Sequence, residues 1–212
     1  MKNLIKLFSF ILALSVANAQ NFNGSIEFSY STSKDSITKV YWVKNKMIKL
    51  DEHSEKGKTA DGSFIINLDS SKVKCILTKR KLWMVQKNQT PQVIKGKCNV
   101  KKGTATKTIA GISCVEYTVA NAEENTSVTF WIADDNFTFF APLNKLWNRK
   151  DKHSVYFAQI KDLTAGQMPL MSEVKQLSDG KLLSKIEVKK ISKMTPDDAI
   201  FEIPAGFTKF RH

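Results

Sequence analysis

The sequence predicts an α+β protein that is mostly β, and three observations lead to this prediction. Apolar and polar residues alternate over much of the chain, as at Ile26, Phe28 and Tyr30, which is typical of strands with one buried face. Short polar turns separate these segments, so neighbouring strands should pair as an antiparallel meander. After Asp135 the apolar spacing becomes helical, and it returns to an extended pattern near Gln167.

The first 19 residues have the pattern of a secretory signal peptide. Lys2 and Lys6 precede an apolar run, 7–16, that is too short to span a bilayer. Ala17-Asn18-Ala19 is an A-x-A site, which predicts cleavage between Ala19 and Gln20. A buried N-terminal helix is the alternative interpretation. We expect an exported protein, periplasmic or secreted, that is soluble after cleavage and does not span the membrane.

The rest of the chain, 20–212, has the length of a single domain. The net charge of the whole chain is +13, which favours contact with an anionic surface of the cell envelope. The lysines are dispersed over nearly every predicted strand and turn, however, and this is more typical of solvated faces and protected sheet edges than of a binding stripe. Export argues against nucleic acid as a partner.

The first half of the chain predicts a run of short strands in which alternate positions are apolar. Some of these strands, such as 37–43, carry apolar residues on both faces and should lie inside the sheet. A charged loop is expected over 51–62 and a long mobile loop over 87–104. The predicted strands are 23–30, 37–43, 47–50, 64–68, 73–77 and 82–86.

The second half begins with the segment that organises the prediction, 106–135. It reads as two strands, 112–120 and 126–133, joined by the polar turn 121–125. Two amphipathic helical pieces follow, which need a face of the sheet to cover. They lie at 139–147 and 155–160, and beyond them come a hairpin of 169–177 with 181–192, a very short helix from Thr195 and an extended tail, 201–207.

Several segments resemble a family of exported proteins of unknown function that is common in Bacteroidetes. They are IAGISCVEYTV followed by FWIADD, the later MPL and the ending AIFEIPAGF, and NGSIEFSY and YWVKNKMIKLD also fit. This family looks related in architecture to the periplasmic lipoprotein carriers of the LolA/LolB type. The resemblance implies a curved antiparallel sheet, a half-open barrel, with two short helices covering its mouth. Lipoprotein transfer does not follow from it, because a fold does not imply a function.

No group of ionisable residues has the pattern of a catalytic or metal site. His53 lies among acidic residues in 51–55, but consecutive side chains point in different directions and a solvated loop is favoured. His153 has Asp151 and Ser154 beside it in sequence, and such immediate neighbours seldom converge. We therefore expect a protein that is not an enzyme and that has no metal and no cofactor.

The chain has three cysteines, Cys75, Cys98 and Cys114. An odd count in an oxidising compartment leaves at least one that cannot pair within the chain. Cys75 alternates with apolar neighbours and is expected to pack as a small hydrophobic residue. The sequence leaves the pairing open.

Aromatic residues give the better indication of function. If the helices cover one face of the sheet, the other face could line a cavity for an acyl chain or a similar apolar ligand, although core packing is the commoner role for any one of these aromatic residues. We expect a protein that binds a hydrophobic or lipidic molecule, or a lipidated chain. The alternative is a structural or protein-interaction module of the envelope with no bound ligand. The candidate ligand-binding residues are Trp42, Trp83, Tyr117, Trp131, Phe140 and Trp147.

Overall fold

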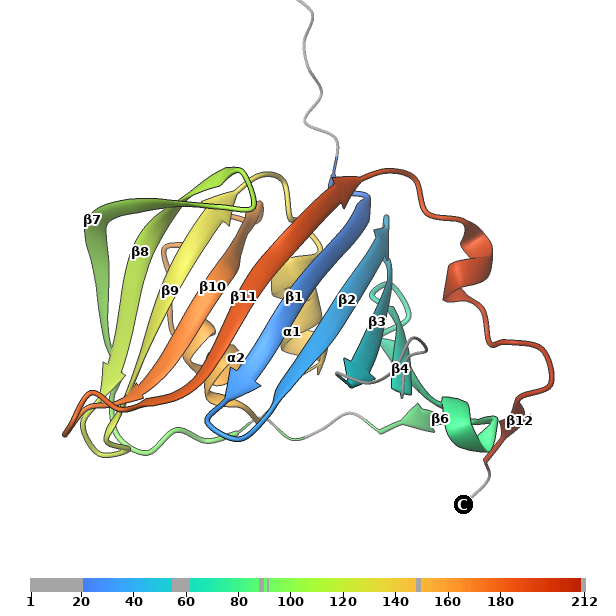
Figure 1. Ribbon diagram of the computed structural model, residues 1–212, viewed down its shortest axis with the longest axis horizontal. Coiled ribbons are helices and arrows are strands. Elements are labelled where there is room, and N and C mark those ends of the chain that lie inside the picture. Colours follow the sequence, from blue (N-terminus) through green and yellow to red (C-terminus); the bar gives the residue numbers. More distant parts are fainter. Residues whose placement is uncertain (1–20, 55–61, 88–89, 91, 148–149, 211–212) are drawn as a thin grey trace, which may run out of the picture.

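The computed structural model describes residues 21–54, 62–87, 90, 92–147 and 150–210. The predicted signal peptide lies outside the described residues. Within the described residues, twelve strands form one sheet (Figure 1). They are β1 Gly24–Thr32, β2 Ser36–Lys44, β3 Met47–Ser54, β4 Gly62–Asn67, β5 Lys72–Leu77, β6 Leu82–Gln86, β7 Asn99–Ile109, β8 Ile112–Asn121, β9 Thr126–Asp134, β10 Gln167–Gln176, β11 Leu182–Lys193 and β12 Thr208–Lys209.

Two meanders make up this sheet, and β1 and β11 join them. The spatial order is β12-β6-β5-β4-β3-β2-β1-β11-β10-β9-β8-β7, and every neighbouring pair is antiparallel except β12 with β6. The sheet is curved and ends at β12 and β7 without closing (Figure 1). Strand β1 thus pairs with a strand that lies more than 150 residues later, for example through Tyr30 opposite Ile186.

Two helices, α1 Phe140–Trp147 and α2 Lys152–Phe157, lie behind the sheet in Figure 1. They pack against β9 and β10, and we call the face of the sheet toward them the inner face. The single-turn helices η1 Thr78–Arg80 and η2 Asp198–Phe201 complete the fold. The prediction of a mostly β protein with a curved antiparallel sheet and two short helices is confirmed.

The register assigns each strand residue to the inner or the outer face. Ile26 on β1 is opposite Tyr41, which is opposite Leu50 and then Phe64, so these side chains share the inner face. Across the junction Ile26 is also opposite Ile191 of β11. Because these inner-face residues pack with the helices, the main core lies between the sheet and α1.

Strand β7 was missed by the sequence prediction, which places a loop over 87–104. Only Ile109, the last residue of β7, is buried, and the strand pairs with β8 alone. An edge strand with lysines such as Lys101 and Lys107 exposed has no apolar alternation to reveal it. In the same way residues 51–54, predicted as loop, continue β3. Their backbone pairs with β2 as far as Ser54 and with β4 as far as Glu52, and the polar sequence here has no apolar alternation to reveal the strand.

Gly24 allows the close approach of β1 to β11 at the start of the junction. Its φ is +150°, and a Cβ atom at this position would lie 2.0 Å from the carbonyl oxygen of Ser192. A side chain here would therefore push the two backbones apart, and backbone cannot move aside as a flexible side chain can.

We expect Gly24→Ala to lower the free energy of unfolding by at least about 2 kcal/mol more than Gly180→Ala does. Gly180 also has a positive φ, +70°, but no atom lies within 4 Å of its Cβ position, so it controls for backbone strain alone. Urea unfolding of both variants measures the difference. Equal losses would mean that the junction tolerates a wider separation than the structure implies.

Candidate functional site

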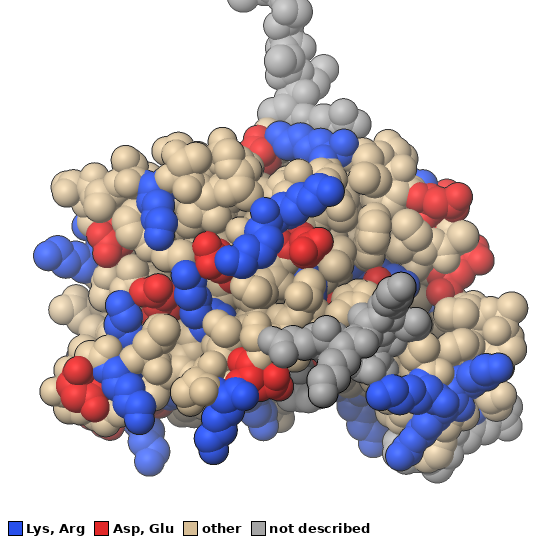
Figure 2. Space-filling view, viewed as in Figure 1, with Lys and Arg blue, Asp and Glu red and all other residues tan. Residues whose placement is uncertain are grey.

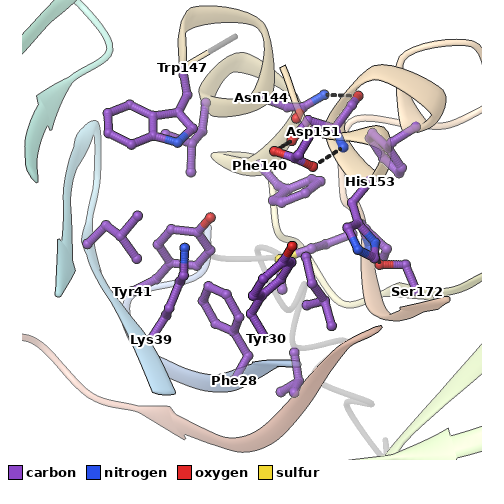
Figure 3. Close-up of a pocket in the computed structure, with 18 of the residues that line it drawn as sticks. Phe28, Tyr30, Lys39, Tyr41, Phe140, Asn144, Trp147, Asp151, His153 and Ser172 are labelled. Carbon is purple, nitrogen blue, oxygen red and sulfur yellow. Dashed lines mark hydrogen bonds between the residues drawn. The ribbon is translucent and has the colours of Figure 1, made fainter. Parts of the chain in front are cut away.

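A pocket of about 440 Å³ lies between the inner face and the two helices (Figure 3). Its sheet wall includes Phe28 on β1 and Tyr41 on β2, and Ile186 and Val188 on β11. Its helix wall includes Phe140, Leu143 and Trp147 of α1 and Phe157 of α2. Both meanders therefore contribute to one pocket, and the β1–β11 junction forms its floor.

Helix α1 reaches across the hollow and is held by aromatic contacts at both ends. Trp147 meets Phe64 of β4 edge to face, with ring centroids 4.5 Å apart. Phe140 meets Phe157 of α2 in the same manner at 5.2 Å. Leu143, one turn from each, is buried. The helical spacing of these apolar residues places all of them on the side that faces the sheet.

The start of α2 is fixed by a side-chain cap. Asp151 accepts a hydrogen bond from the backbone N–H of Ser154 at 2.9 Å and another from its hydroxyl at 3.1 Å. The amide of Asn144 donates to the carbonyl oxygen of Ser154 at 3.3 Å and so ties α1 to α2. The cap that orients α2 therefore also places polar groups in the pocket wall (Figure 3).

Lys39 and Tyr30 bring polar groups into the pocket from the sheet, and Figure 3 shows both side chains pointing toward the helices. The Lys39 ammonium is 2.7 Å from a carboxylate oxygen of Glu52 and 5.6 Å from the centre of the Tyr30 ring. Lys150 also lines the pocket and is exposed. An apolar interior with cations at its margin suits a ligand that has an apolar body and an anionic end.

His153 is buried where α2 meets the sheet, with 5 % of its surface exposed. Its Nδ1 lies 2.7 Å from the hydroxyl of Ser172 on β10, and its Nε2 lies 2.9 Å from the hydroxyl of Ser184 on β11. Burial lowers the pKa of His153 from 6.5 to about 4, and the nearby Asp151 opposes this shift. The imidazole is therefore neutral at pH 7, and its two hydrogen bonds clamp α2 onto two strands.

This shift makes the stability of the fold depend on pH. Between the folded pKa of about 4 and the ordinary value of 6.5, the unfolded chain binds a proton that the folded chain does not, so stability falls as the pH falls. From pH 7.5 to pH 5 we expect a loss of about 2 kcal/mol from His153 alone. Urea unfolding of the wild type and of His153→Gln at both pH values isolates this contribution. The same loss in both proteins would contradict it.

The pocket lies on the face of the sheet that the helices cover, and not on the opposite face, where the sequence prediction places the cavity. Of the residues predicted to bind a ligand, two lie on α1 and four on the sheet. Phe140 and Trp147 line the pocket, while Tyr117 is buried beside α2 and donates a hydrogen bond to Asp162 at 3.3 Å outside the pocket wall. The other three residues, Trp42, Trp83 and Trp131, lie on the outer face of the sheet. Each is next in its strand to a residue of the inner face, as Trp131 is next to Phe130, and therefore points the other way. A role in binding stays a prediction for all six.

Sequence analysis did not single out the sheet residues of the pocket wall. Phe28 and Tyr30 do show strand alternation, but nothing local says that the helices cover their face. The partners of His153 were also missed, because Ser172 and Ser184 come from two later strands and not from its neighbours in sequence.

The described residues contain no group of three or more His, Cys, Asp or Glu side chains that could hold a metal ion. Cys75, Cys98 and Cys114 all fall within this part of the chain, and no disulfide joins any two of them. Burial raises the pKa of the Cys114 thiol to about 11, so it is protonated at neutral pH. Among the helices described, none has the length and apolar character needed to cross a bilayer.

The fold and the pocket define an open, curved β-sheet protein with an apolar hollow beneath two helices. The chain belongs to the family described as "Domain of unknown function (DUF4412)", which matches residues 22–207. The expectation of a family of unknown function is thereby confirmed, and a source in Bacteroidetes stays a prediction. No curated protein matches the sequence.

Solved structures share the fold at low sequence identity. An uncharacterized conserved protein from Thermus thermophilus has a TM-score of 0.51 and 10 % identity, over 90 % of this chain and 91 % of that one. A chain of the Pseudomonas aeruginosa MucA/MucB complex has a TM-score of 0.51 and 12 % identity, over 87 % of this chain and 56 % of that one. This chain thus spans little more than half of the second protein.

A LolA superfamily protein from Nitrosomonas europaea is also similar, with a TM-score of 0.35 and 10 % identity over 87 % of this chain and 91 % of that chain. A TM-score this low supports no argument about fold or function. The likeness to the first two structures concerns the fold alone.

Proposed function

We propose that this is an exported, non-enzymatic protein that binds a hydrophobic or lipidic ligand in the pocket between the inner face and the helices. The observation that carries the proposal is an apolar cavity of about 440 Å³ whose margin carries the charged side chains of Lys39, Lys150 and Asp151. Export rests on the signal-peptide pattern of residues 1–19.

The size of the pocket supports a single-chain ligand. If each non-hydrogen atom takes about 30 Å³, the volume of a water molecule in the liquid, the cavity accommodates roughly 15 such atoms. This matches one acyl chain of ordinary length better than a multi-chain lipid. Burial of such a chain against Phe28, Ile186 and Val188 would provide the free energy of binding.

A substitution that fills the pocket should lower the affinity for a ligand without lowering the stability of the fold. We expect Ile186→Phe to weaken the binding of a fluorescent fatty-acid analogue by about tenfold or more, because the larger ring occupies the cavity, while stability is kept or raised. Leu183→Phe is the matched control, because Leu183 lies on the same strand as Ile186 but is exposed and does not line the pocket, and it should leave affinity unchanged. Fluorescence titration and urea unfolding give the two quantities. Parallel losses of both for Ile186→Phe would indicate packing without a ligand site.

Lys39 should favour ligands with a carboxylate end. Lys39→Met combined with Glu52→Gln removes the ion pair without leaving a buried charge unpaired. We expect this double variant to bind a fatty acid about five- to tenfold more weakly than the wild type does. Its affinity for the corresponding fatty alcohol should be unchanged. Competition titrations with both compounds measure the ratio, and equal losses for the two would remove Lys39 from head-group recognition.

The alternative is a structural or protein-interaction module of the envelope whose pocket stays empty. One protein that shares the fold is found in a complex of MucB with MucA, so a protein partner has a precedent in this architecture. Under this alternative, neither variant above would affect the retention of an apolar ligand, because none would bind.

A further inference from the structure

Positive side chains gather at the end of the sheet farthest from β7. Lys74 on β5, Arg80 at the end of η1, Lys81 after it and Lys209 on β12 form what we call the basic corner, together with Lys79. Figure 2 shows blue side chains over β6, η1 and β12, and no red side chain of the described residues lies among them on the face in view. The dispersed lysines of the sequence are thus locally concentrated by the fold.

Apolar groups lie between these cations on the outer face. Trp83 is half-buried, and its ring is 5.7 Å from the Lys74 ammonium and 5.4 Å from the Lys209 ammonium. Val85 is 47 % exposed and is opposite Lys74 in the β5–β6 register. The short strand β12 places Lys209 directly beside Trp83. The corner therefore combines fixed cations with an exposed aliphatic and an indole side chain.

We propose that the basic corner docks on the surface of an anionic lipid bilayer. Lysine and arginine near an anionic leaflet are attracted to its head groups, while tryptophan and aliphatic side chains favour the boundary between head groups and acyl chains. A soluble polyanion would bind through the charges alone, so Val85 would not contribute to its affinity. The inference concerns a surface separate from the pocket and does not depend on the pocket's ligand.

Vesicle co-sedimentation of the exported form, with the signal peptide removed, tests this surface. The wild type should bind vesicles of phosphatidylcholine with about 30 % phosphatidylglycerol, and pure phosphatidylcholine vesicles only weakly. Arg80→Glu with Lys81→Glu should weaken binding by at least about 25-fold, since the loss of each cation near the surface costs about fivefold and the introduced carboxylates add repulsion. Lys34→Glu with Lys181→Glu is the matched control, because both lysines are exposed in turns elsewhere. It should change affinity by less than about threefold.

A second variant, Val85→Ser, leaves the charge unchanged and should weaken vesicle binding about threefold or more through lost apolar contact. Equal effects of the two charge-reversal variants would overturn the proposal, because binding would then follow net charge and not the corner. Unchanged binding of Val85→Ser would overturn the bilayer as the partner, as would heparin binding without vesicle binding. Equal binding to neutral vesicles would also contradict it.

Discussion

The pairing of β1 with β11 is the constraint on which the rest of the structure depends. Each meander can form from local turns, but a single curved sheet exists only because these two strands, from opposite ends of the chain, lie side by side. The floor of the pocket is built at this junction, from Phe28 and Tyr30 on one side and Ile186 and Val188 on the other. The pocket therefore exists only when both ends of the chain have folded.

The second element of the pocket, α2, is held from two directions by polar contacts. Toward the sheet, His153 forms hydrogen bonds with the hydroxyls of Ser172 on β10 and Ser184 on β11. On the other side, Glu124 in the β8–β9 turn receives hydrogen bonds from Lys152, from the Tyr156 hydroxyl at 2.7 Å and from the backbone of Lys95 at 3.1 Å. Burial opposes ionisation of Glu124, but these donors outweigh it and keep its pKa below the usual range. Such contacts position a short helix that could not be stable alone.

Local patterns in the sequence were sufficient for most strands and for both helices. The hairpin of β8 and β9 and the helical spacing of Phe140, Leu143 and Trp147 are visible because one side of each element is buried. The junction of β1 with β11 leaves no local signal, since neither strand differs in pattern from one at an edge. For the same reason sequence alternation separates Trp131 from Phe130 but does not say which of them faces the helices. Strand β7, exposed on nearly every residue, carries no such pattern.

We propose that the hollow beneath the helices holds an apolar ligand. Native mass spectrometry of the exported protein, followed by organic extraction and identification of what is released, tests it most directly. We predict a stoichiometric species with one acyl chain, which the Ile186→Phe variant should fail to retain. A clean apo mass, with no later uptake of a fluorescent fatty-acid analogue, would contradict the claim and favour an interaction module of the envelope.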